Sequence, residues 1–563
     1  MCIKSWDSAP LFLLAFCLSA MTALPAYAVT YHVRPDGGSA GQCTGRADAP
    51  YPGSGWKLPC AWSHPFWALR VNSDNQSVSW KLKGGETLVI AEGSYKMGIG
   101  GPNTKWCSHY WPWVCRLPPI PSGPDPQHPT RILGKNWNRG CSDPPELWGT
   151  ERAEAILDLT GSSNVLIDCL DITDHSSCAN NHPDPKLACQ RDNYPNAMGP
   201  FADKGIYAQD SSNVTLRHLN IHGLASAGIH AGRISDWKLT DVRIAANGLV
   251  GWDGDIYEDS SNTGTIRFRR VVVDGNGCPE KYPDKTPDNC FDQAFNGYGD
   301  GIATARTGGH WIIEDSTIAN NTQDGIDLLY VSRVPEKTLI EIRRTQVFGN
   351  AGNQIKVNGP TKIENVLAVG NCAWFEGEPF ATYMGMLCRA GGGALALNLG
   401  GGDHVSVINS TIVGYGDVLA GGQCDNQFAV CDESDTVVFA NNIFRGYGDY
   451  FDPDDQSAFV WVDNESHPPF PGKVTGEHNL AWDVKFSDTF PANRDPAILI
   501  ADPQFQNAAM DTFDGHLKAT SAARNTGLAV GALKGLIPNH DLERVSRPQG
   551  TGVDRGAYEY VSP

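Results

Sequence analysis

The stretch Asn213-Val-Thr-Leu-Arg-His-Leu-Asn-Ile221 is one copy of a phrase that recurs through the middle of this sequence. Apolar and polar residues alternate along it, which is the pattern of a β-strand with one buried face. Other copies occupy residues 164–172, 236–244, 310–318, 339–347, 404–412 and 436–444. No amphipathic helix of useful length separates the copies, and this argues against a βα solenoid or a doubly wound sheet.

A second, shorter strand pattern begins with glycine. Its copies are Gly205-Ile-Tyr, Gly228-Ile-His, Gly251-Trp-Asp, Gly301-Ile-Ala and Gly325-Ile-Asp. The first three glycines are 23 residues apart, and the last two are 24 residues apart. The 50 residues between the third and fourth glycines correspond to about two coils, with an inserted loop that contains Cys278 and Cys290.

Together the two patterns predict a coil of three short strands with a period in the low twenties, which is typical of a β-helix. The main alternative, a leucine-rich repeat, needs a Leu-x-x-Leu-x-Leu phrase that the sequence lacks. We therefore expect an all-β chain folded as a right-handed parallel β-helix. Asparagine tolerates a left-handed backbone and can hydrogen-bond a stacked copy of itself. We expect such a ladder at Asn247, Asn276, Asn320, Asn350 and Asn371.

The two ends of the chain differ from its middle. We expect residues 29–150 to form an N-terminal cap and a first coil, residues 151–450 the central β-helix, and residues 451–563 the last coils and an irregular C-terminal cap. The N-terminal loops are rich in tryptophan: Trp56, Trp62, Trp67, Trp80, Trp106, Trp111 and Trp113. These residues either cover the open end of the solenoid or stack on sugars.

Residues 1–28 have the character of a signal peptide. Lys4 precedes the apolar run Leu11-Phe-Leu-Leu-Ala-Phe-Cys-Leu18, and Ala26-Tyr-Ala28 is a small-residue cleavage pattern. We expect cleavage after Ala28 and a secreted or periplasmic protein. No later segment has the roughly 18 apolar residues that a membrane helix needs, so we expect no membrane association.

The cysteines agree with export. Sixteen are present, and removal of Cys2 and Cys17 with the signal peptide leaves an even number. Several lie close together in the sequence: Cys43/Cys60, Cys107/Cys115, Cys178/Cys189, Cys278/Cys290, Cys372/Cys388 and Cys424/Cys431. Such spacings suit disulfides in an oxidising compartment, although the pairing itself stays open. A metal-thiolate site would need Cys-x-x-Cys pairs, which are missing.

The charge balance restricts the partners. The net charge is −19, which excludes non-specific electrostatic binding of nucleic acid. An anionic polysaccharide is compatible with so acidic a protein only if a cation bridges the two. We expect a monomer that acts on such a polymer.

Stacking the glycine-led strands predicts a site. If Ile206, Ile229, Trp252, Ile302, Ile326 and Ile355 point inward, the residue after each points outward. The outward column then reads Tyr207, His230, Asp253, Ala303, Asp327 and Lys356. Asp300 and Asp324 precede their glycines one coil apart, so three carboxylates converge. Their mutual repulsion and hard oxygen ligands point to a Ca²⁺ site at Asp300, Asp324 and Asp327.

Further polar residues flank this cluster. His230, Arg233, Asp253, Asp255 and Arg306 are candidates for substrate binding, and each is also compatible with a solvated surface position. Asp-Gly pairs are common in turns, so a single pair is weak support. The aligned acids together with an aligned lysine are more specific.

Two phrases carry a family resemblance: Asn320-Asn-Thr-Gln-Asp-Gly-Ile-Asp-Leu328 and Ala351-Gly-Asn-Gln-Ile-Lys-Val-Asn-Gly359. They resemble the site region of family 9 polysaccharide lyases, a pectate-lyase-like group of β-helix enzymes. The resemblance implies Ca²⁺ held by Asp300, Asp324 and Asp327, and Lys356 as the base of a β-elimination at a uronic acid. Gln323 stands where that family has an acid, and the close match covers only about residues 296–360.

Three other functions remain open. A β-helix glycoside hydrolase would use paired acids, for which Asp253, Asp324 and Asp327 are available. The Asp-Asp pair and the Gly-His-Gly phrase that such hydrolases have one and two coils further on are missing there. A C5-epimerase would share the first step of the lyase. A non-catalytic carbohydrate-binding surface protein would leave the aligned acids solvated. The sequence does not identify the polymer.

Overall fold

A computed structural model describes residues 28–562 of the chain. Outside the described residues are the segments 73–76, 108–114, 116, 151–152, 180–188, 190–200, 255, 257–261, 288, 292–298, 305–306, 329–338, 372–374, 378–379, 382–387, 389–392, 416–417, 425–429, 449–457, 465–469 and 487–494. The expected signal peptide therefore lies almost entirely outside the described residues.

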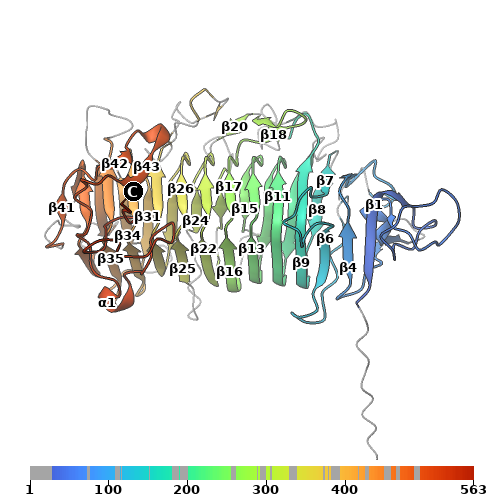
Figure 1. Ribbon diagram of the computed structural model, residues 1–563, viewed down its shortest axis with the longest axis horizontal. Helices are drawn as coiled ribbons and strands as arrows, with labels where there is room; N and C mark the ends of the chain where they lie inside the picture. The colour runs from blue at the N-terminus through green and yellow to red at the C-terminus, as the bar shows by residue number, and fades with distance from the viewer. Residues whose placement is uncertain are drawn as a thin grey trace, which may run out of the picture.

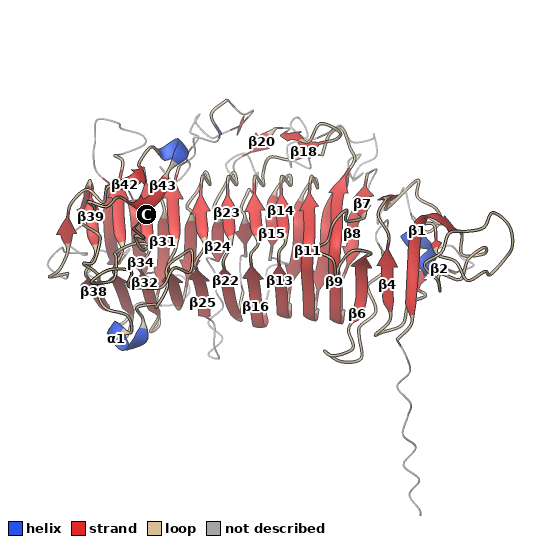
Figure 2. Cartoon of the chain, viewed as in Figure 1, coloured by secondary structure: helices blue, strands red, loops and turns tan. Residues whose placement is uncertain are grey.

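The chain is a right-handed parallel β-helix, as the sequence predicts. Its coils stack side by side along one long axis (Figure 1), and strands make up most of the body (Figure 2). The described strands form one 24-stranded sheet, one 11-stranded sheet and four small two-stranded sheets. The 24-stranded sheet covers two faces of the coil, because long strands such as β9 (Ser163–Asp174) bend at a left-handed residue and pair with different neighbours on each side.

The 11-stranded sheet forms the third face of the coil. Its strands are β8 (Ala153–Asp158), β10 (Ala202–Gln209), β12 (Ala227–Gly232), β15 (Val250–Asp253), β21 (Ile302–Ala303), β24 (Ile326–Leu328), β27 (Ile355–Asn358), β31 (Leu395–Leu399), β34 (Val418–Cys424), β37 (Ala458–Asn464) and β40 (Val484–Phe486). Each strand pairs in parallel with the next one.

The 24-stranded sheet contains the strands of the other two faces of the coil. They are β1 (Thr30–Gly38), β4 (Thr87–Ile90), β5 (Ser94–Lys96), β6 (Thr130–Gly134), β7 (Glu146–Gly149), β9, β11 (Ser212–His222), β13 (Ser235–Thr240), β14 (Arg243–Ala245), β16 (Thr263–Arg269), β17 (Val272–Asp274), β22 (His310–Glu314), β23 (Thr317–Ala319), β25 (Leu339–Arg343), β26 (Gln346–Phe348), β28 (Thr361–Glu364), β29 (Leu367–Gly370), β32 (His404–Ile408), β33 (Thr411–Gly414), β35 (Thr436–Ala440), β36 (Ile443–Gly446), β38 (Lys473–Glu477), β39 (Leu480–Trp482) and β41 (Leu499–Ile500).

The remaining elements are short. They are β2 (Leu69–Val71) with β3 (Val78–Trp80), β18 (Glu280–Lys281) with β19 (Thr286–Pro287), β20 (Cys290–Phe291) with β30 (Phe380–Ala381), β42 (Phe505–Asn507) with β43 (Asp514–Leu517), the 3₁₀ turns η1 (Pro65–Ala68) and η6 (Met510–Thr512), and the single turn α1 (Ala532–Gly535). No helix among the described residues has the length and apolar character needed to cross a membrane.

The core runs the length of the solenoid. The six residues expected to point inward from the glycine-led strands are all fully buried. Trp237 and Trp311 are buried as well, and Trp252, one of the six, lies edge-on to both. Burial of each large apolar side chain contributes about 1.5–3 kcal/mol, so every added coil supplies its own share of stability.

Buried asparagines form a ladder at the turn that leads into the 11-stranded sheet. Each Nδ2 donates to the Oδ1 of the next coil, from Asn247 to Asn276 (2.9 Å), Asn276 to Asn321 (2.8 Å) and Asn321 to Asn350 (2.7 Å). The expectation of Asn320 was therefore wrong by one position. Asn320 has the left-handed backbone (φ 54°) that Gly349 (φ 68°) has in the next coil.

The ladder also ends one coil earlier than expected. The Asn350 carboxamide donates to the Oε1 atom of Gln354 (2.8 Å), which belongs to the same coil. This bond takes the place of a bond to an asparagine of the next coil. Asn371, in the next coil, donates instead to the carbonyl of Met510. Gln354 thus closes the ladder immediately before Ile355 and Lys356.

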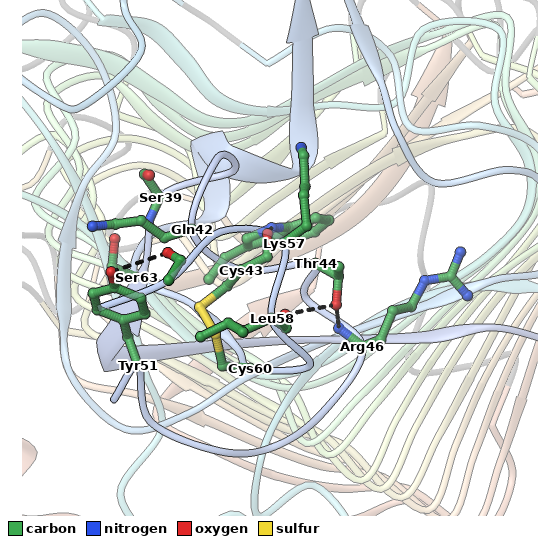
Figure 3. The surroundings of a disulfide bond; sticks show 12 residues. Ser39, Gln42, Cys43, Thr44, Arg46, Tyr51, Lys57, Leu58, Cys60 and Ser63 are labelled. Carbon is green, nitrogen blue, oxygen red and sulfur yellow. Dashed lines mark hydrogen bonds between the residues drawn. A yellow bond between two sulfur atoms is a disulfide. The ribbon is translucent and has the colours of Figure 1, made fainter. Parts of the chain in front are cut away.

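The loops of the N-terminal coils are cross-linked by the Cys43–Cys60 disulfide. Figure 3 shows this disulfide with Thr44, whose hydroxyl donates to the carbonyl of Leu58 (3.1 Å). Trp62, Trp80 and Trp106 are buried in this region, so they are not exposed for stacking on sugars, and their burial favours the capping alternative. Trp56, in contrast, is 78% exposed. Trp111 and Trp113 lie outside the described residues.

The described disulfides follow the close spacings in the sequence. Bonds join Cys43–Cys60, Cys107–Cys115, Cys178–Cys189, Cys278–Cys290 and Cys424–Cys431. A sixth joins Cys141 to Cys169. Cys388 is also disulfide-bonded, and Cys372 lies outside the described residues.

The C-terminal segment, residues 501–562, returns along the flank of the solenoid. The end of the chain therefore lies over the body rather than beyond the last coil (Figure 1). Its apolar side chains pack on outward residues of the coils, among them Leu367, Val413 and Ile443. Strands β29 and β33 are consequently buried at every position, without the alternation seen elsewhere.

Candidate active site

The site lies on three consecutive strands of the 11-stranded sheet: β21, β24 and β27. Ala303 pairs in register with Asp327, and Asp327 pairs with Lys356. On the N-terminal side the same column continues through Asp253, His230 and Tyr207. The register expected from the sequence is confirmed, because alternate residues of a strand point to opposite faces. Every residue of the column except the buried Ala303 is partly exposed.

Close backbone approach explains why glycine begins these strands. A Cβ atom on Gly301 would lie 2.5 Å from the carbonyl oxygen of Gly325 and 2.8 Å from Asn321 Nδ2. A Cβ atom on Gly325 would lie 2.5 Å from Asn350 Nδ2. The glycines thus leave room for the asparagine ladder, and the ladder packs directly behind the acids.

The three predicted acids form one cluster. Asp300, Asp324 and Asp327 each offer an oxygen atom within 4.8 Å of the others. Asp300 accepts a hydrogen bond from the backbone N–H of Asp324 (2.9 Å), which ties the two coils together at this point. The structure therefore brings all three candidate metal ligands to one place.

Lys356 completes the cluster. Its ammonium donates to Asp324 Oδ2 (3.1 Å) and Asp327 Oδ2 (2.8 Å). The side chain of Asp324 is completely buried, whereas 17% of Asp327 and 22% of Lys356 remain exposed. The buried acids thus form the inner layer of the site, and Asp327 and Lys356 form its surface.

The electrostatics of the cluster are unusual. Burial, together with the charges of Asp324 and Asp327, raises the pKa of Asp300 well above its usual value. Burial and the charge of Asp324 raise the pKa of Asp327 to about 7, although Lys356 opposes this shift. Burial lowers the pKa of Lys356, but the charges of Asp324 and Asp327 outweigh it, so the pKa rises above its ordinary value. Burial and repulsion between the acids therefore favour the protonated forms of Asp300 and Asp327, and a bound cation would relieve the repulsion.

The donor set fits a hard divalent cation. All three residues offer carboxylate oxygens, the ligands that Ca²⁺ prefers. Asp327 Oδ1 is buried and has no hydrogen-bond partner in the described part of the chain, so it is available as a ligand. Gln323, the departure from the family pattern, is buried beside the acids and contributes no carboxylate.

Of the predicted substrate-binding residues, only some lie on the outward column of Asp327. His230 and Asp253 lie on the same outward column as Asp327, with Nε2 and Oδ2 3.5 Å apart. Tyr207 lies edge-on to the His230 ring. Arg233 follows the end of β12 and pairs with Asp210 (2.7 Å), one coil back. Asp255 and Arg306 lie outside the described residues.

One contributing residue was missed in the sequence. Asn353 holds Asp324 in place, because its backbone N–H and its Nδ2 both donate to Asp324 Oδ1 (2.6 and 3.1 Å). Its signal was its position in the phrase Gly352-Asn353-Gln354, directly before the strand of Lys356. Proximity of that turn to the acids of the previous coil becomes visible only when the coils are stacked.

A separate cavity of about 420 Å³ lies between the outer face of β26 and β29 and the C-terminal segment. Its lining includes Phe348, Leu367 and Phe513 and no cluster of titratable groups. The acid and lysine cluster is therefore the candidate active site.

Comparison with known proteins gives likenesses of structure only. No family model matches the sequence, and no curated protein matches it. The structure is similar to that of pectate lyase Pel9A, at 13% sequence identity and a TM-score of 0.38, covering 94% of this chain and 96% of that chain.

Two further solved structures are similar. The mannuronan C-5 epimerase AlgE6 A-module of Azotobacter vinelandii is 12% identical, with a TM-score of 0.34, and the match covers 75% of this chain and 92% of that chain. The tailspike protein gp49 of Acinetobacter baumannii bacteriophage Fri1, a capsular polysaccharide depolymerase, is 9% identical, with a TM-score of 0.31 and coverage of 74% and 57%. At these identities the likeness is one of fold.

Proposed function

We propose that this protein is a secreted polysaccharide lyase that cleaves a uronic-acid-containing polysaccharide by β-elimination. One observation carries the proposal: three converging carboxylates lie against a lysine whose side chain is partly exposed beside Asp327 on the outward column. The disulfides support a working place outside the cytoplasm, because such bonds persist in oxidising compartments.

The burial pattern divides the roles. Asp300 and Asp324 are at most 3% exposed, so they are suited to hold a cation from beneath and cannot contact a polymer. Asp327 bridges the two layers, and Lys356 stands at the solvent edge. In the proposal the three acids would hold Ca²⁺, and Lys356 would act as the base.

The chemistry follows from this division. When bound, Ca²⁺ supplies positive charge that offsets the acids and the uronate carboxylate and makes the adjacent C5–H more acidic. The charges of Asp324 and Asp327, which raise the pKa of Lys356, would be offset by the bound cation, and this would favour the neutral amine. Lys356 Nζ, in its neutral form, would then take the C5 proton. The electron pair left at C5 forms the C4=C5 double bond, the C4–O bond breaks, and the leaving oxygen takes a proton from water. Asn353 fixes Asp324, so that the ligand oxygens keep their positions.

The geometry favours this reaction over hydrolysis. A glycosidase needs two carboxyl groups that flank the bond and touch the sugar or the attacking water. Asp324 is completely buried and is already bonded to Asn353 and Lys356, so it is badly placed for that role. Only Asp327 of the three acids reaches the surface.

The first prediction concerns Lys356. Lys356→Ala should abolish formation of unsaturated product from the active polymer in a screen of anionic polysaccharides, measured by ultraviolet absorbance. Lys362→Ala is the matched control, because Lys362 forms a partly buried ion pair with Glu364 on another face and should keep full activity. New reducing ends without unsaturation would indicate a hydrolase, and an altered uronate without cleavage an epimerase. Undiminished cleavage by Lys356→Ala would refute the mechanism.

The second prediction concerns the cation. EGTA should abolish cleavage, and Ca²⁺ should restore it. Ca²⁺ should also raise the Tm of the metal-free protein, since a ligand present at 100 times its Kd stabilises the native state by about 2.7 kcal/mol. Asp327→Asn should remove that shift in Tm. An unchanged Tm with Ca²⁺ would contradict a metal site at these acids.

A further inference from the structure

The 11-stranded sheet changes character on the C-terminal side of Lys356. Lys356 pairs with Ala396, which pairs with Gly421, so small residues continue its column. Asn358 pairs with Asn398, which pairs with Gln423, so carboxamides continue the neighbouring column. Coils lie about 4.8 Å apart, and a pyranose unit is about as long as this spacing. A polymer laid along the axis therefore meets these coils one sugar at a time.

We propose that Asn398 and Gln423 bind uncharged sugar units next to the reacting uronate. The substrate would then be a heteropolysaccharide in which neutral sugars separate the uronates, rather than a run of uronates. The inference rests on the proposed function only for the position of the reacting uronate above Asp327 and Lys356.

The hydrogen bonding of these carboxamides supports a binding role. Asn398 and Gln423 are half-buried, and within the described part of the chain neither side chain donates or accepts a hydrogen bond. Stacked polar pairs elsewhere on the solenoid do bond, for example Asn213 to Asn164 (2.7 Å) and Asn220 to Asp171 (2.9 Å). A carboxamide both donates and accepts, which matches the hydroxyl groups of a sugar.

The charge distribution decides which sugar fits. Strands β31 and β34 carry no charged residue, whereas β10, β12 and β15 on the other side carry titratable residues, namely Asp203, Lys204, His230 and Asp253. A uronate over Asn398 or Gln423 would find no cation on these strands, in a protein of net charge −19. Leaving a carboxylate without a partner against such a surface is unfavourable. A neutral sugar avoids that cost and still uses the carboxamides.

Binding can be tested without cleavage. The full-length Lys356→Ala protein is run by affinity electrophoresis through gels that contain polygalacturonate or alginate, which are contiguous uronates. Other gels contain hyaluronan or deacylated gellan, in which uncharged sugars separate the uronates. Retention should be at least tenfold stronger with one of the two heteropolymers. Adding Asn398→Ala and Gln423→Ala should weaken that retention about tenfold, the effect expected for two lost hydrogen bonds.

A matched control keeps the result specific. Gln346→Ala removes a half-buried carboxamide from another face of the solenoid and should leave retention unchanged. Equal or stronger binding of the contiguous uronates, unchanged retention after the double substitution, or no retention by any polymer would each overturn the inference. Heteropolymer binding through Asn398 and Gln423 without cleavage by the wild-type chain would refute only the lyase function.

Discussion

His222 is a buried histidine that ties an inserted loop to the solenoid. Its Nε2 lies 2.9 Å from Asp171 Oδ1, and its Nδ1 contacts Glu280 on the hairpin of β18 and β19. Thr173 also lies within hydrogen-bond distance of Nδ1, at 3.4 Å. Burial lowers the pKa of His222, but the hydrogen bonds to Asp171 and Glu280 outweigh it and raise the pKa above 6.5.

The third prediction follows from this raised pKa. A raised histidine pKa gives stability that is fully present below the unfolded value of about 6.5 and is lost as the pH rises through the folded value. Hydrogen exchange in the β18–β19 hairpin should therefore accelerate in the wild type as the pH rises, after correction for intrinsic exchange. In His222→Gln this dependence should disappear. Glu280→Gln should move the transition to lower pH, and an unshifted transition would contradict the role of that carboxylate.

Single residues were predictable from the sequence where strand alternation alone decides their direction. Asp327 and Lys356 face the same way because each follows a buried isoleucine in a short strand. Asn320 and Asn321 were not distinguishable, because both are asparagine, which suits a turn. The structure separates them: Asn321 is fully buried in the ladder, and Asn320 takes the left-handed position. Which of two adjacent asparagines faces inward depends on turn geometry that residue type does not encode.

The asparagine ladder is the element that supports the site from behind. Asn321 Oδ1 accepts from both the backbone N–H (3.1 Å) and Nδ2 (2.8 Å) of Asn276. Asn321 lies three residues before Asp324. Any change to this rung therefore acts on the coil that presents the acids.

The fourth prediction concerns this rung. Asn321→Ala should destabilise the protein by about 2–6 kcal/mol, because the backbone N–H and the Nδ2 of Asn276 both lose their Asn321 acceptor, at about 1–3 kcal/mol for each buried donor. Asn320→Gly should change stability by less than about 1 kcal/mol, because glycine adopts the left-handed backbone freely. Denaturant unfolding of both variants measures the difference. Equal effects of the two substitutions would refute the separate roles of the adjacent asparagines.

Strands with one buried face were predictable from the sequence. For strands that are buried on both faces, the sequence did not indicate which segment covers the outer face. The pattern of β29, Leu-Ala-Val-Gly, lacks the alternation of its neighbours. The reason is the C-terminal segment, whose Met510 and Leu517 pack on its outer face. A loss of alternation signals a second cover, but it does not say which distant segment supplies that cover.

At the scale of the whole molecule, the C-terminal segment joins coils that otherwise contact only their neighbours. In a solenoid, local stability is set by each repeat and its two interfaces. This segment bonds to the turns of several coils, through Asn365 Nδ2 to His540 O (2.8 Å), Asn409 Nδ2 to Asp554 O (3.1 Å) and Gly556 N to Asn441 O (2.6 Å). A buried ion pair between Arg547 and Glu559 (2.8 Å) holds the segment in shape.

The fifth prediction is that loss of this ion pair loosens only part of the solenoid. Glu559→Ala leaves Arg547 buried and unpaired, which costs about 3–5 kcal/mol. Hydrogen exchange should then accelerate in the C-terminal segment and in the turns at Asn365, Asn409 and Asn441. Exchange in β10, β12 and β15 should stay unchanged, because those strands do not contact the segment and coils unfold locally.

An exposed ion pair of the same segment serves as the control for this localisation. Arg544 is half exposed and pairs with Asp315 (2.6 Å). Arg544→Ala should cost less than about 1 kcal/mol, since solvent screens the pair. If Glu559→Ala accelerated exchange equally in β10 and in the turn at Asn409, the solenoid would unfold as one unit and the segment would stabilise all of it. If exchange changed only within the segment itself, the turns would be stable without their cover. The contacts of the C-terminal segment predict a third result. Exchange should accelerate in the segment and in the turns that it covers, and it should stay unchanged in β10.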